Sequence, residues 1–213
     1  MEDVLEVYTR PHDPPRPQIR MDETSKQLLG DAHQPVPMEP GRPERQDYEY
    51  ERGGVANLFL FREPLQGRRW VDITEQRTKV DWAHQIEELV DIRYPEAERI
   101  VLVMDNLNTH TPASLHEAFE PEEARRLADK LEVHYTPKKH GSWLNMAEIE
   151  LSVLSRQCLD RRVPDFETLQ SEARAWRERR DEKGVRIDWR FNAEDARIKP
   201  KAAIPFTSGV TLY

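Results

Sequence analysis

A continuous apolar run at residues 100–104 constrains the fold of this chain more than any other feature. The run reads Ile-Val-Leu-Val-Met, and it is followed at once by Asp105 and a polar segment. A strand that is apolar along its whole length is typical of a central strand that is covered on both faces. The sequence therefore predicts a buried central strand at 100–104.

The segments around this strand predict further strands and helices in alternation. In chain order they are a strand at 18–22, a hairpin formed by 56–61 and 69–74 with its turn at Gln66 and Gly67, a helix at 81–94 ended by Pro95, the strand at 100–104, a helical stretch at 112–130 broken near Pro121, a strand at 131–135, and helices at 143–162 and 166–183. This order predicts an α/β fold with a mixed sheet and helices on its faces. Functional sites in such sheets gather at strand ends.

Proline marks the start of the chain and one long connection. Residues 1–17 contain four prolines and are expected to form an extended, proline-rich linker. Residues 26–54 are rich in proline and charge, so we expect a long surface loop there. A chain of 213 residues suits one domain of ordinary size. We predict that domain over residues 18–195, followed by a C-terminal tail over 196–213.

The composition bounds the environment and the partners of the protein. A single cysteine, Cys158, excludes an internal disulfide framework and is compatible with a reducing compartment. No apolar run approaches the roughly 20 residues of a membrane helix, and the acidic start is unlike a secretory signal, so we expect a cytoplasmic protein with no membrane partner. The net charge of −8 argues against strong DNA binding by this chain alone.

Three carboxylates stand in settings that suit metal ligands. Asp22 ends the strand predicted at 18–22, Asp105 ends the central strand, and Glu148 lies in the opening of a predicted helix. Acids that converge on one point repel each other unless cations bind there, and Mg²⁺ prefers carboxylate oxygens. Together the three acids predict a two-metal site for phosphoryl transfer.

Each of these acids also has an ordinary structural explanation. An aspartate after a strand often forms a turn, and a helix glutamate is often solvated. Glu23 competes with Asp22, and strand alternation places the two on opposite faces, so that only one of them can point into a site. Glu150 competes with Glu148, and the helical pattern favours Glu148 without deciding between them.

Other chemistries find less support in the sequence. His110, His134 and His140 raise the possibility of zinc, but no His-Glu-x-x-His pattern or cysteine pair accompanies them. Cys158 lies on the apolar stripe of a predicted helix, which favours a place in the core over a role as a nucleophile. The chain contains no Gly-x-Ser-x-Gly elbow of the kind that serine hydrolases use.

Four segments carry recognisable motifs, at residues 21–26, 40–45, 103–110 and 135–148. The last two are specific: Asp-Asn-x-Asn-x-His begins at Asp105, and His-Gly-Ser-Trp-Leu-Asn-x-x-Glu ends at Glu148. These motifs resemble those of the insertion sequence 630 family of transposases, the bacterial branch of the mariner-like DDE transposases. The resemblance covers most of the chain and implies a ribonuclease H-like fold.

The resemblance also implies roles for individual residues. Asp22, Asp105 and Glu148 match the family's catalytic acids, which hold two Mg²⁺ or Mn²⁺ ions, and the Leu-Asn-x-x-Glu pattern selects Glu148 over Glu150. The implied activity is metal-dependent nicking of DNA at insertion-sequence ends, followed by strand transfer into target DNA. The residues expected to bind DNA come from the basic loop before the helix and from the motif that follows it: Lys138, Lys139, His140, Trp143 and Asn145.

Two departures from the family pattern shape these expectations. The 42 residues between Asp105 and Glu148 (106–147) exceed the usual spacing, and a helical stretch at 119–127 accounts for the extra length. Family members also carry an N-terminal helix-turn-helix, in place of which this chain has a proline-rich segment. We therefore expect a separate helix-turn-helix subunit, or the product of an upstream reading frame, as a partner, together with a homodimer on paired DNA ends. The alternatives are a truncated, inactive remnant, a non-enzymatic interaction protein, or a different ribonuclease H-like nuclease.

Overall fold

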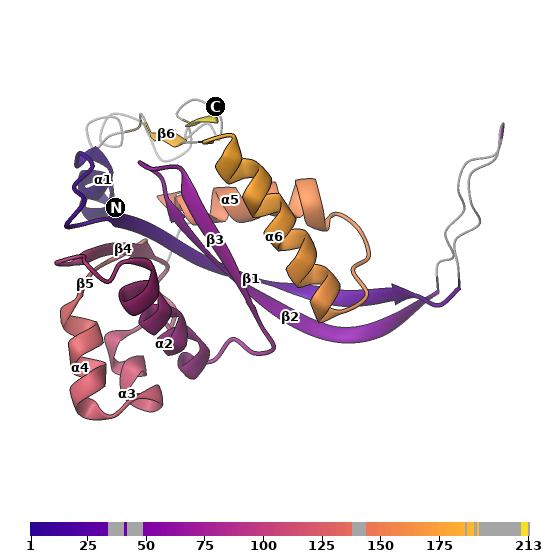
Figure 1. The fold of residues 1–213 in the computed structure, drawn as a ribbon, viewed down its shortest axis with the longest axis horizontal. Helices are drawn as coiled ribbons and strands as arrows, with labels where there is room; N and C mark the ends of the chain where they lie inside the picture. Colours follow the sequence, from indigo (N-terminus) through magenta and orange to yellow (C-terminus); the bar gives the residue numbers. More distant parts are fainter. Residues whose placement is uncertain are drawn as a thin grey trace.

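The computed structural model describes residues 1–33, 41, 49–137, 144–185, 187–189, 191 and 210–212. Its main sheet has five strands in the order β3-β2-β1-β4-β5 (Figure 1). The strands are β1 (Gln18–Asp31), β2 (Tyr50–Glu63), β3 (Arg68–Thr74), β4 (Ile100–Met104) and β5 (Leu131–Tyr135). β1 pairs antiparallel with β2 and parallel with β4, so the sheet is mixed, as predicted.

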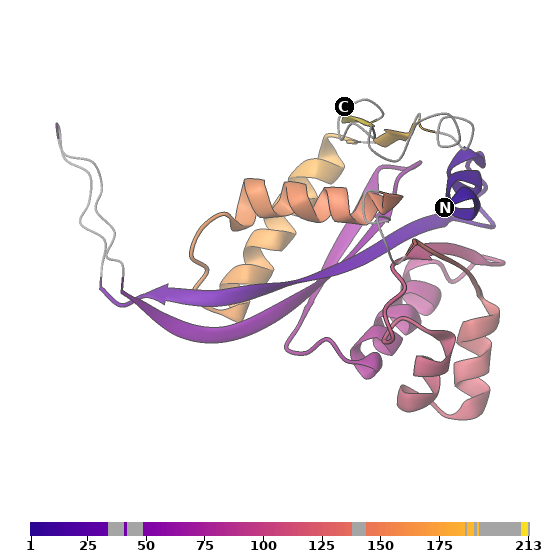
Figure 2. The same cartoon turned by 180° about the vertical axis from the view of Figure 1, so that it is seen from behind.

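Helices cover both faces of this sheet (Figure 1 and Figure 2). The helical segments are α1 (Glu2–Thr9), α2 (Lys79–Glu88) with the π-helix η1 (Leu89–Arg93), the 3₁₀ helix η2 (Pro112–Ser114), α3 (Leu115–Ala118), α4 (Pro121–Asp129), α5 (Met146–Leu154) with the π-helix η4 (Ser155–Leu159), and α6 (Phe166–Glu182). Two short strands, β6 (Ile187–Trp189) and β7 (Val210–Leu212), form a second sheet. Among the described helices, none is both long and apolar enough to span a bilayer.

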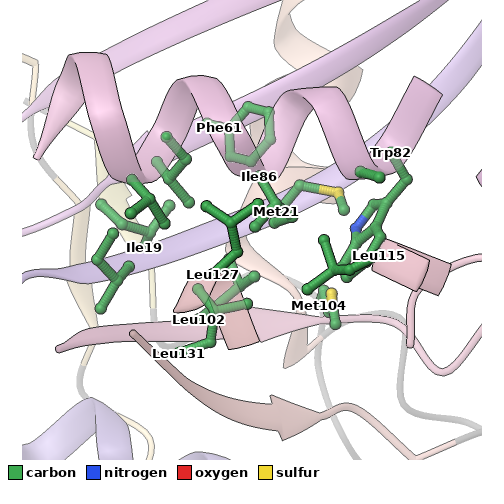
Figure 3. Packing of buried hydrophobic residues seen from close by; sticks show 14 of the residues in the cluster. Ile19, Met21, Phe61, Trp82, Ile86, Leu102, Met104, Leu115, Leu127 and Leu131 are labelled. Atoms are coloured by element: carbon green, nitrogen blue, oxygen red, sulfur yellow. The ribbon is translucent and has the colours of Figure 1, made fainter. Parts of the chain in front are cut away.

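Alternating side chains of the sheet supply the core on each face. Ile19 and Met21 of β1 and Leu102 and Met104 of β4 pack against α2, α3 and α4 (Figure 3). The opposite face of β1 and β2 packs against α5 and α6. All five residues of β4 are buried, which confirms the prediction of a central strand covered on both sides.

The first residues of the chain differ from the expected extended linker. Residues 2–9 form α1, whose Val4, Leu5 and Val7 pack against Val101 and Val103 of β4. The four prolines of this region all lie after Arg10 and leave α1 free of helix breakers. The apolar spacing of α1 therefore forms a helix that covers one face of the central strand. The division of the chain at residues 17 and 195 stays a prediction.

The connection from residue 26 to 54 is also more ordered than predicted. β1 continues to Asp31 and β2 begins at Tyr50, and the two pair as a long antiparallel hairpin with a register shift between Leu28 and Leu29. This pairing provides hydrogen-bond partners for the backbone N–H and C=O groups of both strands. Leu28 is buried against α5 and α6. Asp22 therefore lies inside β1 and not at its end. Most of the 40–45 motif lies outside the described residues.

Candidate active site

The three acids singled out from the sequence border one cavity of about 440 Å³. Asp22 comes from the interior of β1, Asp105 follows β4, and Glu148 lies in the first turn of α5. The parallel pairing of β1 with β4 and the packing of α5 on β1 bring these distant segments together. The remaining residues around the cavity are Glu23, Thr24, Thr136, Asn145, Leu151, Ser152 and Ser155.

The pKa of Asp22 reflects its burial and the charges of the neighbouring acids. Burial raises the pKa of Asp22 to about 7, and repulsion from Asp105, Glu23 and Glu148 adds to the rise. The backbone N–H of Glu23 donates to Asp22 Oδ1 at 2.8 Å and partly offsets it. Negative charge is therefore concentrated at this cavity, as a site for a cation requires.

His110 connects Asp105 with Glu23 behind the cavity. Its Nδ1 lies 2.6 Å from Asp105 Oδ1, and its Nε2 lies 3.0 Å from Glu23 Oε2. Burial lowers the pKa of His110, but the contacts with Asp105 and Glu23 outweigh it and raise the pKa to about 9. The ring is thus cationic at neutral pH and holds two carboxylates. The sequence suggested His110 only as a zinc ligand, although its fixed place in the motif that begins at Asp105 is a signal for this second role.

Glu23 borders the cavity together with Asp22, while its carboxylate contacts His110 behind the cavity. Pairing between β1 and β4 ends at Arg20 and Val103, just before these two acids. The carboxylate of Glu23 is buried and pairs with cationic groups. Its nearest cations are His110 and Arg77, whose Nη1 lies 3.6 Å from Oε1.

Two groups of three potential metal ligands in the described part of the chain have ligand atoms within 4.8 Å of one another. The first is formed by Glu23, Asp105 and His110. The second is an acidic group on the surface, Glu87, Asp91 and Glu123, in which Arg126 already pairs with the last two. Asp22 and Glu148 border the cavity but belong to neither group.

Asn145 fixes the start of α5 beside Asp22. Its side chain caps the helix by accepting from Ala147 N at 3.1 Å, and its Nδ2 donates to Met21 O at 3.1 Å. Asn145 is buried, so these contacts position Glu148 relative to β1. The other residues expected to bind DNA, namely Lys138, Lys139, His140 and Trp143, lie outside the described residues.

Glu150, the competitor of Glu148, occupies a different environment. Its carboxylate is fully buried and pairs with Arg62, with Arg69 at 3.2 Å and with Arg180 at 2.8 Å. It does not border the cavity that Asp22, Asp105 and Glu148 share. Glu150 is therefore part of the core between the sheet and α6.

The chain was compared with known protein families, protein sequences and solved structures. Residues 18–170 match the family described as DDE superfamily endonuclease, which is more than half of the chain. No curated protein sequence matches the chain. Three similar solved structures are complexes of the Mos1 transposase. The Mos1 mariner paired end complex with Mn has a TM-score of 0.56 and 17% identity, with 85% of this chain and 53% of that chain covered. The Mos1 transposase paired-end complex with left transposon end has a TM-score of 0.55 and 15% identity, with 83% and 53% covered, and the Mos1 strand transfer complex has a TM-score of 0.53 and 14% identity, with 82% and 50% covered.

These likenesses concern the fold. The mixed five-stranded sheet with helices on both faces is similar to the ribonuclease H-like catalytic domain of the Mos1 transposase, which confirms the predicted fold class. The chain spans about half the length of the solved chains that it matches.

Proposed function

Because the chain belongs to the DDE superfamily of endonucleases, we propose that it is the catalytic domain of a transposase of the insertion sequence 630 branch. Its reaction is the nicking of DNA at insertion-sequence ends and the transfer of the cut strand into target DNA. The observation that carries this proposal is the single cavity bordered by Asp22, Asp105 and Glu148. An inactive remnant would have no need to keep this arrangement of acids.

The residues around the cavity fit divalent cations. Burial and repulsion from Asp105, Glu23 and Glu148 raise the pKa of Asp22, and a cation bound beside it would relieve that repulsion. Carboxylate oxygens are the donors that Mg²⁺ and Mn²⁺ prefer. We propose that Asp22, Asp105 and Glu148 hold two such ions. Ions held there would supply activation of the attacking water or 3′-hydroxyl and stabilisation of the leaving oxygen.

The chain's own residues orient these ligands. The hydrogen bond between His110 Nδ1 and Asp105 fixes the orientation of that carboxylate, as partners behind metal ligands commonly do. Asn145 caps α5 and donates a hydrogen bond to the carbonyl of Met21, and these two contacts hold the first turn of α5, with Glu148, next to β1. Positioning of this kind contributes much of the rate of phosphoryl transfer.

DNA is the proposed partner, and the similar solved structures are described as paired-end and strand transfer complexes of a transposase. The loop residues Lys138, Lys139, His140 and Trp143 are proposed to hold the DNA backbone near the acids. Asn145, which was also expected to bind DNA, is buried and instead holds α5 against β1. Because the net charge is −8, we propose that a basic helix-turn-helix partner shares in binding the ends. Two copies of the chain would then act on paired ends.

A nicking assay tests the proposal. The substrate is a plasmid with the inverted repeats that flank the gene, incubated with the chain, with or without the product of an upstream frame, in Mg²⁺ or Mn²⁺. We expect nicking that requires metal and is lost in Asp105→Asn. The control Asp129→Asn changes an aspartate of α4 that is 76% exposed and should keep full activity. Full activity of Asp105→Asn would refute the mechanism, and a wild type inactive in every combination would favour the remnant.

A further inference from the structure

A cluster of buried arginines lies on the α6 side of the sheet, away from the acids. Arg62 of β2 and Arg69 of β3 are fully buried, and Arg180 of α6 is largely buried. All three surround Glu150, and Arg69 also approaches Asp181, with 3.2 Å between Nη1 and Oδ1. Three guanidinium groups therefore face two carboxylates, which leaves one positive charge in excess.

The hydrogen bonds of this cluster are also incomplete. Arg62 and Arg69 both donate to the carbonyl of Val185, at 3.0 and 2.8 Å. Arg62 Nε and Arg180 Nη2 make no hydrogen bond with the described residues, and Arg69 Nε and Nη1 lie 3.2 Å from carboxylate oxygens of Glu150 and Asp181 without forming well-aligned hydrogen bonds. Buried charged donors without acceptors are costly, and a bound anion is one way to satisfy them. Burial accordingly lowers the pKa of Arg62 to about 10 and also lowers the pKa of Arg69.

An open cavity of about 490 Å³ reaches this cluster at Arg69. Arg68, Arg93 and Arg177 surround its mouth, and Trp70 and Tyr94 form part of its wall. Arg68 is exposed and makes no hydrogen bond or ion pair among the described residues. The guanidinium of Arg93 lies over the Trp70 ring, 5.7 Å from its centroid, and is held there by Glu88 at 2.5 Å. The cavity shares no residue with the one that Asp22 borders.

We propose that this cavity binds the phosphate group of a small molecule, with Arg69 at its base and Arg68 and Arg93 at its mouth. Planar guanidinium groups match the oxygens of phosphate in pairs, and this geometry makes charge-assisted hydrogen bonds strong. A phosphate supplies negative charge to offset the excess of guanidinium groups, and acceptors for the arginines that border the cavity. The volume lies within the range of small-molecule sites and exceeds what a bare phosphate ion needs.

The acids around the cavity argue for a small ligand and against a DNA backbone. Glu178, Asp181 and Glu182 of α6 border the same mouth as the arginines. An extended polyanion would have to pass these carboxylates and would be repelled, whereas a compact anion can reach Arg69 between them. The net charge of −8 adds to the repulsion of a long nucleic acid.

Titration calorimetry and thermal unfolding of the full chain test this proposal at constant ionic strength. The probes are inorganic phosphate, deoxyadenosine monophosphate and a short DNA duplex. The variant is Arg68→Ala with Arg93→Ala, which alters the mouth and leaves the buried cluster intact. The matched control is Arg125→Ala, an arginine of α4 that is 83% exposed. Because Arg69→Met removes a buried partner of Glu150 and can prevent folding, the double variant at the mouth is the primary test.

We expect phosphate or the mononucleotide to bind and to raise the unfolding temperature of the wild type and of Arg125→Ala. In the double variant, binding should weaken about tenfold or more, because charge-assisted hydrogen bonds are lost. Tighter binding of the mononucleotide than of phosphate identifies a phosphorylated small molecule as the ligand, and equal binding identifies free phosphate. Unchanged affinity in the double variant, or no binding of either up to about 10 mM, overturns the proposal. Binding of the duplex alone through these arginines overturns it in favour of a DNA contact.

Discussion

Glu148 and Glu150 lie two residues apart on α5, yet they belong to regions of opposite character. Glu148 borders an open cavity in which acids gather, whereas Glu150 is buried among arginines. A separation of two residues turns the side chain by about 200° around a helix, which is enough to place the two on opposite sides. One short helix therefore supplies an acid to a site and an acid to the core.

The two regions share one physical property, because each concentrates charges of one sign. The cavity concentrates carboxylates, and burial and repulsion raise the pKa of Asp22 there. The cluster around Glu150 concentrates three guanidinium groups around one fully buried carboxylate. The first arrangement suits a cation and the second an anion. The comparison predicts that substitutions in the first region alter activity and those in the second alter stability.

The largest expected effect is on activity. Glu148→Gln should lower the rate of metal-dependent nicking by about a thousandfold or more, because metal-ion stabilisation of the transition state is worth several kcal/mol. Its free energy of unfolding should stay within about 0.5 kcal/mol of wild type, as for most substitutions outside the core. Nicking rates and urea unfolding measure the two quantities. Near-normal nicking by Glu148→Gln would refute the prediction that Glu148 is needed for activity.

The second effect is on stability. Glu150→Gln should lower the free energy of unfolding by about 3–5 kcal/mol, because it leaves three arginines with an uncharged partner in the core. Urea unfolding of this variant beside Glu148→Gln provides a matched pair, since both replace one carboxylate on the same helix. A loss below about 1 kcal/mol would mean that water or another anion already compensates the cluster.

Metal binding should act on the first region only. Mn²⁺ or Mg²⁺ at a hundred times its dissociation constant should stabilise the wild type by about 2.7 kcal/mol, because the ion binds the folded state alone. The effect should largely disappear in Asp105→Asn and remain in Asp129→Asn. Thermal unfolding across a metal titration measures it, and equal stabilisation of both variants would place the metal elsewhere.

The smallest expected effect concerns Asp72 of β3, near Arg93 and Arg177. Burial raises its pKa to about 6, and repulsion from Glu88 adds to the rise although the two arginines oppose it. A folded-state pKa above the unfolded value gives stability that is present below about pH 4 and is lost as pH rises through 6. Between pH 4 and pH 7 the wild type should lose about 1 kcal/mol relative to Asp72→Asn, allowing for partial exposure. Parallel pH profiles would refute this.

Local sequence patterns predicted most of the fold. The hairpin turn at Gly67, the break at Pro121 and the buried strand at 100–104 are all confirmed, because each depends on residues that are neighbours in the chain. Helix α1 was missed because four prolines dominate the composition of residues 1–17. The long β1–β2 pairing was missed because its partners lie on either side of a segment rich in proline and charge.

The candidate site was only partly predictable. The motifs pointed to Asp22, Asp105 and Glu148, and all three border one cavity. Two further groups have contacts there that the sequence did not predict. Glu23 was weighed as a competitor of Asp22, and its buried carboxylate contacts His110. His110 was considered as a zinc ligand, and it joins Asp105 to Glu23.

The sequence by itself predicted most of the elements, the central strand and the candidate acids, because apolar periodicity and motifs are properties of short segments. Only the tertiary structure decided what surrounds each charge. Glu148 and Glu150 look alike in the sequence. Their environments differ because Arg62 of β2, Arg69 of β3 and Arg180 of α6 pair with Glu150. The free energy of a charge depends on solvent and on partners that are distant in the chain, and the path of the chain sets both.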